Sequence, residues 1–417
     1  MIFPIVRRLA LGALLMTGGG WLALAQSPSP ATGGASALGL PASAAGALSE
    51  AGGGIRVGPL RLIPTLDLAR GYDDNLYQRQ TNVLGSAYVM TSPALRLESP
   101  PGQLRFDVTL RMDATRYDSA PADNTLSYGL TGNMEMTFTG RASMRLRAEH
   151  RHGSDPRGFT DRAISATPDE WDNTGAEGVF RYGAQGAQGR IEIDTAYYLR
   201  RYTNNRATTA AADRDTSQLG GTFYWRVRPK TELLLQTQFR RIDYVLPSVS
   251  LDSTEQRHYL GLKWEATAAT TGIAKFGWLE KRFDAGSRNG ISESSWDIGV
   301  RWSPRTYSVV DLVTSRQTGE SSGLGDAIVG TNYGLTWSHA WSSRLRTQAI
   351  ASYRNDQFTG AGISRQDNVS TLGGKVLYDF RRWLRFGVEY THSERDSSAF
   401  GLDYRRNVIL FTVGGTL

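Results

Sequence analysis

The chain has 417 residues, no cysteine, a formal net charge of +7 and 21% charged residues. The lack of cysteine excludes a disulfide-stapled fold and thiolate metal centres. Of the 47 basic residues, only Lys230, Lys263, Lys275, Lys281 and Lys375 are lysine. Arginine binds carboxylates and phosphates through two parallel hydrogen bonds, which lysine cannot do. A basic chain can also bind nucleic acid, but the export signal at its start argues against that partner.

The first residues, "MIFPIVRRLALGALLMTGGGWLALAQ", predict the compartment. Arg7 and Arg8 precede an apolar run that ends in the small-residue motif Ala23-Leu24-Ala25, so residues 1–25 are predicted to be a cleaved secretory signal. The run is too short, and too interrupted by glycine, for a membrane helix. Residues 26–58 are almost all Ala, Gly, Ser and Pro, which predicts a disordered leader in the periplasm.

Residues 59–417 show a different pattern, clearest in "LRFDVTLRMDATRY" from Leu104. Apolar and polar residues alternate strictly there, which predicts a β-strand with one face of each kind. A slip of one residue would expose Arg105 and Arg111 to lipid, at about 2–4 kcal/mol each near the bilayer midplane. We therefore expect the apolar face to contact lipid and the charged face to line a lumen.

The same alternation recurs along the chain in segments of ten to fourteen residues, more weakly at 171–182, 307–315 and 369–379. Very short connections alternate with long polar ones, such as 151–170, 317–327 and 355–367. Strands about twice the globular length, with this rhythm of connections, are typical of outer-membrane barrels. The prediction is an all-β, antiparallel, up-and-down transmembrane barrel of about eighteen strands at residues 59–417. It would lie in the Gram-negative outer membrane, contact lipid and lipopolysaccharide, and enclose an aqueous channel.

Aromatic residues stand near the ends of several predicted strands, and they form either interface girdles or single packing contacts: Trp225, Trp264, Trp302, Trp341 and Tyr390.

The predicted lumen face is rich in arginine and acidic residues. The arginines are Arg105, Arg111, Arg145, Arg147, Arg190, Arg226, Arg240, Arg301, Arg346, Arg354 and Arg385. The acidic residues are Asp107, Asp113, Glu135, Glu149, Glu192, Asp194, Asp297 and Glu389. Two roles stay open together: rings of arginine favour anions in a pore, and arginine–carboxylate pairs across strands brace the wall.

The segments "PTLDLARGYDDNLYQRQTN" and "SAYVMTSPALRLES" resemble the opening of outer-membrane β-barrel proteins of exopolysaccharide and capsule biosynthesis loci, a β-barrel porin family. The shared element is a strand that ends in Tyr72-Asp73-Asp74-Asn75-Leu76. The resemblance implies a conduit or accessory in exopolysaccharide export, with polysaccharide and a periplasmic export protein as partners. The arginine-rich aqueous lumen predicts that the exopolysaccharide is anionic. The alternative is a general or anion-selective porin for small solutes.

Other chemistry has weak support in the sequence. Asp73-Asp74-Asn75 offers oxygen ligands for calcium, but without EF-hand spacing it is expected to form a turn, and no metal is predicted. The "HRH" at 150–152 is expected to be solvated at a strand-to-loop edge. No G-x-S-x-G nucleophile motif occurs, so we expect neither an enzyme nor a cofactor, with an outer-membrane esterase as the remaining enzymatic alternative.

Overall fold

The computed structural model describes residues 53–417 except 185, 268 and 322; the predicted signal and most of the predicted leader lie outside the described residues. The strands are β1 (Ile55–Val57), β2 (Leu60–Asp73), β3 (Ser86–Glu98), β4 (Leu104–Tyr117), β5 (Thr125–Thr137), β6 (Ala142–Asp155), β7 (Asp169–Tyr182), β8 (Gly189–Tyr202), β9 (Arg214–Arg228), β10 (Thr231–Tyr244), β11 (Ser253–Thr267), β12 (Thr270–Phe283), β13 (Ile291–Arg305), β14 (Ser308–Glu320), β15 (Ala327–Ala340), β16 (Leu345–Thr359), β17 (Arg365–Arg381), β18 (Leu384–Ser397) and β19 (Tyr404–Thr416). Short helical turns lie between them: η2 (Pro121–Asp123), α2 (Arg206–Thr209), η3 (Ala210–Ala212) and η4 (Pro247–Val249). In the part of the chain that is described, no helix is long and apolar enough to cross a membrane.

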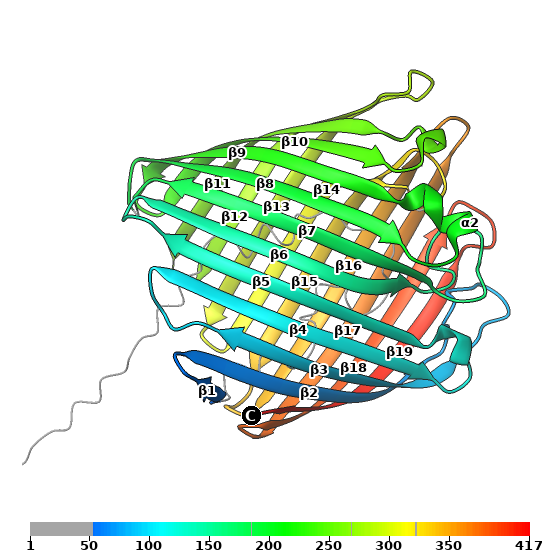
Figure 1. Ribbon diagram of the computed structural model, residues 1–417, viewed down its shortest axis with the longest axis horizontal. Coiled ribbons are helices and arrows are strands. Elements are labelled where there is room, and N and C mark those ends of the chain that lie inside the picture. The colour runs from blue at the N-terminus through cyan, green and yellow to red at the C-terminus, as the bar shows by residue number, and fades with distance from the viewer. Residues whose placement is uncertain (1–52, 185, 268, 322) are drawn as a thin grey trace, which may run out of the picture.

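Strands β2 to β19 form a closed antiparallel barrel of eighteen strands, as predicted (Figure 1). Each strand pairs with the next, and β19 pairs with β2 from Val408↔Asp73 to Thr416↔Thr65. The strands with the weakest alternation are present as β7, β14 and β17. The additional strand β1 continues the edge of β2 beyond the end of β19, pairing Ile55 with Leu62. It lies inside the range 26–58 that the sequence assigned to the leader, so the sheet begins before residue 59.

The side chains of β4 take the orientation that the alternation predicts. Leu104 and Leu110 lie on the outside of the barrel, 46% and 42% exposed. Arg111 points into the lumen and its Nη2 contacts Asp113 Oδ1 at 2.6 Å. The cost of placing arginine in hydrocarbon thus fixes the register of the strand.

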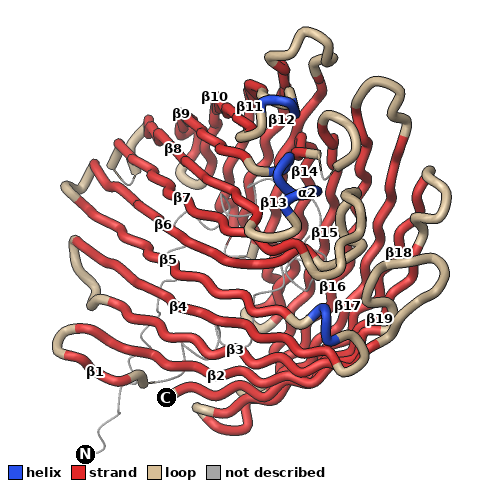
Figure 2. Tube along the Cα trace, turned by 45° about the vertical axis from the view of Figure 1, so that its right-hand side comes forward, coloured by secondary structure: helices blue, strands red, loops and turns tan. Residues whose placement is uncertain are grey.

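The two ends of the barrel differ. At the short-turn end, which carries both β1 and the C-terminus (Figure 1), the Gly54 amide donates to the Leu417 carbonyl at 3.1 Å. The long-loop end carries the helical turns and the long connections (Figure 2). Strands reach further into this end than predicted: β6 runs to Asp155 and β16 to Thr359. The alternation fades there because outward positions become polar, while the backbone pairing continues.

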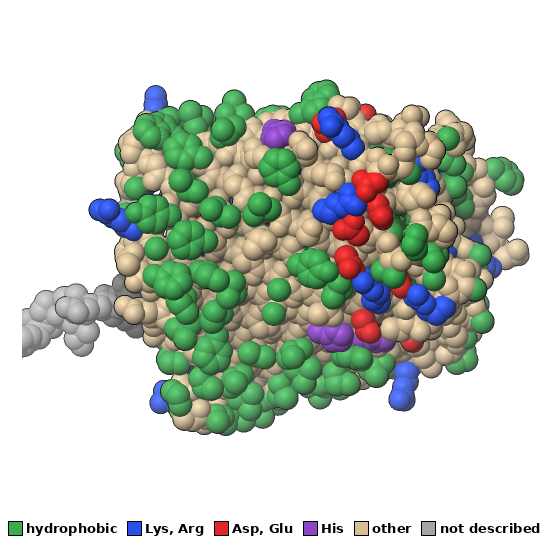
Figure 3. Space-filling model, turned by 45° about the horizontal axis from the view of Figure 1, so that its top comes forward, with side chains coloured by type: hydrophobic (Ala, Val, Ile, Leu, Met, Phe, Trp, Pro, Cys, Tyr) green, Lys and Arg blue, Asp and Glu red, His purple; other side chains and the backbone are tan. Residues whose placement is uncertain are grey.

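Side chains on the outer surface are segregated along the strands. In Figure 3, apolar side chains gather toward the short-turn end and charged ones toward the long-loop end. Trp225, Trp302 and Trp341 are exposed at or beside the short-turn ends of their strands, which fits an interface girdle. Tyr390 also faces outward, but it lies in the middle of β18, so its assignment to a strand end is wrong.

The lipid-facing register gives a direct test. Leu110→Arg places a guanidinium on the outer face near the middle of β4 and should lower the free energy of unfolding by about 2–4 kcal/mol. Thr109→Arg, one residue earlier on the lumen face, should have little effect. Urea unfolding in lipid vesicles measures both variants, and equal losses would contradict the assigned orientation.

Candidate functional site

All nineteen predicted lumen residues lie on the inner face of the barrel. Eight of the eleven arginines form ion pairs: Arg105–Glu135, Arg111–Asp113, Arg147–Glu149, Arg190–Glu232, Arg301–Asp311, Arg346–Asp379, Arg354–Asp356 and Arg385–Asp379. Arg226 donates to the Gly186 carbonyl, and Arg240 lies opposite Glu255 in the ladder. Arg145 has no ion pair among the described residues. Most of the lumen arginine is therefore neutralised in place, which supports the bracing role.

The predicted acidic partners are engaged too, but not always by arginine or across strands. Arg147 and Glu149 pair along one strand at 2.7 Å, because residues i and i+2 share a face. Lys275 pairs with Asp297 at 2.6 Å and Lys375 with Glu389 at 3.2 Å. The other contacts are Glu192 with Arg181, Asp194 with Gln218, and Asp107 with Asn133.

The end of the β14–β15 hairpin leaves the wall and folds into the lumen. Pairing of β13 with β14 begins at Trp296↔Arg316, so β14 beyond Arg316 is unpaired with β13. Glu320 then meets Lys281 Nζ of β12 at 2.6 Å and Tyr244 Oη of β10 at 2.9 Å. The side chain of Lys281 is 0% exposed. The hairpin end therefore lies on the inner face of β10 to β13.

Apolar packing holds this hairpin end as well. Ala327 and Val329 of β15 form a buried cluster with Ile291 of β13, against Phe283 of β12. Gln317 accepts a hydrogen bond from Arg257 of β11 at 3.1 Å. The sequence placed residues 317–327 in a long polar loop and carried no signal that they turn inward, because the partners are distant in the chain.

The loop between β6 and β7, residues 156–168, crosses the mouth from the other side. Arg157 binds Asp123 of η2 and the hydroxyl of Tyr77. Phe159 is 6% exposed and its ring lies 5.4 Å from the guanidinium of Arg406. Asp161 forms an ion pair with Arg365 of β17. Strand β17 is not a neighbour of β6 in the wall: even by the shorter way round the barrel, the strands between them are β5, β4, β3, β2, β19 and β18.

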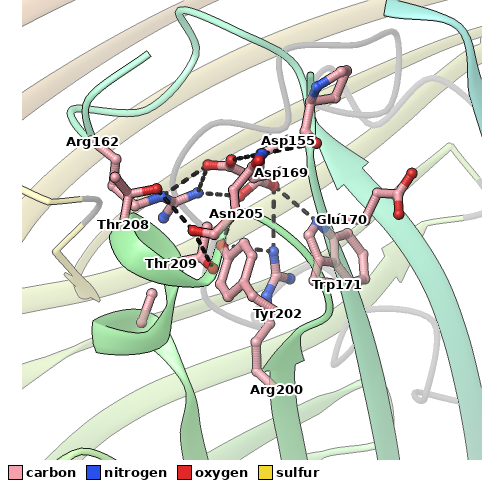
Figure 4. A network of polar contacts seen from close by, with 12 residues as sticks. Asp155, Arg162, Asp169, Glu170, Trp171, Arg200, Tyr202, Asn205, Thr208 and Thr209 are labelled. Atoms are coloured by element: carbon pink, nitrogen blue, oxygen red, sulfur yellow. Dashed lines mark hydrogen bonds and ion pairs between the residues drawn. The ribbon is translucent and has the colours of Figure 1, made fainter. Parts of the chain in front are cut away.

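The root of this loop is a dense polar network (Figure 4). Arg162 Nη2 contacts Asp155 at 2.8 Å and Asp169 at 3.1 Å. Asp155 also accepts hydrogen bonds from Trp171 Nε1 at 2.9 Å and Tyr202 Oη at 2.7 Å. The network fixes the direction in which the loop leaves the wall.

The two inward segments meet over the lumen. A Cβ atom on Gly323, at the tip of the β14–β15 hairpin, would lie 2.9 Å from the backbone nitrogen of Arg162. The left-handed φ of +131° at Gly323 also favours glycine. Together the hairpin end and the β6–β7 loop cover the lumen at its long-loop end.

The Tyr72–Leu76 motif closes the barrel seam. Asp73 accepts from Nε and Nη2 of Arg406 on β19 at 2.6–3.0 Å. Asp74 accepts from the backbone and side chain of Asn407, both at 2.6 Å, while Asn75 donates to the Arg405 carbonyl at 2.9 Å. Both carboxylates are thus occupied by the last strand. Tyr72 faces outward and Leu76 is buried.

All five histidines lie on the outer face. His152 contacts Asp172 at 2.9 Å and stacks on Tyr128, with ring centroids 4.9 Å apart. The expectation that the "HRH" lies at a strand-to-loop edge is wrong, because β6 continues to Asp155.

A closed eighteen-stranded barrel with a charged lumen defines a porin-like outer-membrane β-barrel. The family model described as "Putative beta-barrel porin 2" matches residues 51–416, so the chain belongs to that family. No curated protein matches the sequence.

Several solved barrels are similar in fold. OccAB2 of Acinetobacter baumannii has 12% identity and a TM-score of 0.48, with 85% of this chain and 98% of that one covered. OpdQ of Pseudomonas aeruginosa has 11% identity and a TM-score of 0.47, with 87% and 100% covered. The siderophore receptor PirA of Acinetobacter baumannii has 6% identity and a TM-score of 0.45, with 87% and 81% covered.

The buried pair that holds the hairpin end is testable by stability. Glu320→Gln removes the carboxylate that the Lys281 ammonium contacts. It leaves only Glu255, which is opposite Lys281 in the ladder and already paired with Arg257, so it should cost about 3 kcal/mol. Glu394→Gln breaks the exposed Arg405–Glu394 pair and should cost less than about 1 kcal/mol. Urea unfolding of both variants measures the difference, and a small loss in Glu320→Gln would show that the hairpin end is not held by this pair.

Proposed function

We propose that the protein is a channel for small water-soluble solutes across the outer membrane, with a restricted outer mouth. The observation that carries the proposal is the β14–β15 hairpin end, which lies inside the lumen and is held there by the buried Lys281–Glu320 pair. An eighteen-stranded barrel is wide enough for an aqueous channel. Segments folded into that channel reduce its cross-section and limit the size of solute that passes.

Polysaccharide export, which the resemblance implies, remains a prediction. No contact in the described part of the chain favours a long polymer over a small solute, and the two inward segments act against a wide conduit. Lipopolysaccharide and a periplasmic export protein also remain predicted partners.

The charge of the lumen bears on selectivity. Rings of unpaired arginine would favour anions strongly, whereas here most arginines sit beside a carboxylate within hydrogen-bond distance. We therefore expect a modest preference for anions over cations rather than exclusion of cations.

Shortening the hairpin tests the restriction. Gln317 and Gly330 are opposite each other in the β14–β15 ladder, so residues 318–329 can be replaced by an Asn-Gly turn, which suits a two-residue hairpin. Single-channel conductance in planar bilayers should rise several-fold, and liposome swelling should extend from monosaccharides to oligosaccharides.

The control shortens the exposed tip of another connection at the same end of the barrel. Residues 398–401 of the β18–β19 loop include the fully exposed Phe400, and an Asn-Gly replacement there should leave conductance unchanged. A wild-type protein that passes neither ions nor sugars, combined with loss of surface polymer in a deletion strain, would overturn the channel and favour export.

A further inference from the structure

The carboxylate of Asp161 projects from the β6–β7 loop onto arginine of the far wall. It forms an ion pair with Arg365 of β17, whose side chain is 7% exposed. Arg365 also donates from Nε to Asp367 of its own strand at 2.9 Å. Asp161 is therefore a second carboxylate, brought to this guanidinium by a loop.

A second guanidinium lies on the neighbouring strand. Arg395 of β18 is opposite Val369 of β17, and its Nε donates to the Leu402 carbonyl at 2.6 Å. Within the described part of the chain it forms no ion pair, and the charges of Asp367, Arg365 and Asp161 all act on it. Asp161 thus acts on this guanidinium through its charge without an ion pair, and a solute carboxylate beside Arg365 could approach Arg395 more closely.

Aromatic rings back both guanidinium groups. The ring centroid of Phe358 lies 4.2 Å from Arg365 Cζ, and that of Tyr404 lies 4.8 Å from Arg395 Cζ. Stacking holds a planar guanidinium in one orientation and leaves its edge for two-point binding of a carboxylate. We call Arg365, Arg395, Phe358 and Tyr404 the arginine cradle.

The two carboxylates near the cradle are attached differently. Asp367 belongs to β17 and also accepts from Ser397 Oγ at 2.6 Å, so it stays with the wall. Asp161 belongs to a loop without regular structure. If the loop moved away, the two guanidinium groups of the cradle would have only the Asp367 carboxylate beside them. The remaining positive charge suits one more carboxylate.

We propose that the arginine cradle is a binding site for the carboxylate of a small organic anion, and that Asp161 occupies it as an internal substitute until a solute displaces it. The proposal rests on the proposed channel, since the solute would reach the cradle at the outer mouth. It gives the β6–β7 loop a second role, because the loop carries the carboxylate with which the solute competes for the cradle.

Binding of glucuronate to the full chain in detergent, measured by isothermal titration calorimetry, tests the site, with glucose as the uncharged match. Asp161→Asn keeps the shape of the side chain but removes the competing charge, so glucuronate should bind about tenfold more tightly than to wild type. Arg365→Gln and Arg395→Gln should each weaken glucuronate binding about tenfold or more. Glucose should not bind any variant.

The opposite directions of these changes separate a binding site from simple bracing, because bracing predicts no gain for Asp161→Asn. Asp284→Asn is the matched control: it removes a carboxylate that pairs with Arg241 on the outer surface and should leave glucuronate binding unchanged. Arg395→Gln breaks no ion pair of the described residues, so it tests the cradle even if Arg365→Gln fails to fold.

Unchanged binding in Asp161→Asn, or wild-type affinity in Arg395→Gln, would overturn the cradle. Because calorimetry does not depend on conduction, the two proposals fail separately. If the protein conducts but does not show this binding pattern, the channel proposal stands and the cradle proposal fails. If the protein shows the binding pattern but does not conduct, the cradle proposal stands and the channel proposal fails.

Discussion

Every backbone N–H and C=O group inside hydrocarbon must find its partner within the protein, and the rest of this structure depends on that requirement. A sheet can meet it only by closing on itself. Closure joins the first full-length strand, β2, to the last, β19, and the ladder ends at Val408↔Asp73. The Tyr72–Leu76 motif continues the same seam beyond the last pair of the ladder. The Asp74 amide donates to the Asn407 carbonyl at 3.1 Å, and the side chains of Asp73, Asp74 and Asn75 add further bonds. A segment that looks like a turn in the sequence therefore helps to hold β2 against β19 and so to close the barrel.

Closure also decides where charge can go. Lipid excludes arginine from the outer face of each strand in the hydrocarbon, so the ionised residues of that region collect in the lumen, next to one another and in reach of water. Residues at i and i+2 of one strand, and opposite residues on adjacent strands, share the inner face. Oppositely charged side chains at these positions are therefore close enough to form ion pairs. Most of the candidate arginines in this lumen are therefore paired with a carboxylate, and the five histidines lie on the outer face. If the lumen conducts solutes, as we propose, we expect its selectivity to depend less on the total arginine content than on the few guanidinium groups without a carboxylate.

The two inward segments use different physics. The β14–β15 hairpin end is anchored by a buried ion pair and an apolar cluster, and losing either partner of a buried pair is expensive. The β6–β7 loop is held at its root by the Asp155 network and at its far side by Asp161 and Phe159. The hairpin end thus sets a permanent restriction, and the loop contributes contacts that a solute can replace.

The sequence by itself determined the barrel, its eighteen strands and the face that each side chain takes, because alternation with period two and the cost of charge in lipid act residue by residue. The same alternation puts Arg105, Arg111 and the other candidates on the inner face, while their role in the lumen stays a prediction. Only the tertiary structure decided what residues 151–170 and 317–327 do, and that Asp73, Asp74 and Asn75 lock the seam. Their partners, such as Lys281 for Glu320, Arg365 for Asp161 and Arg406 for Asp73, are far away in the chain. No local pattern encodes contacts between residues so far apart in the chain, whether they lie across the lumen or at the seam.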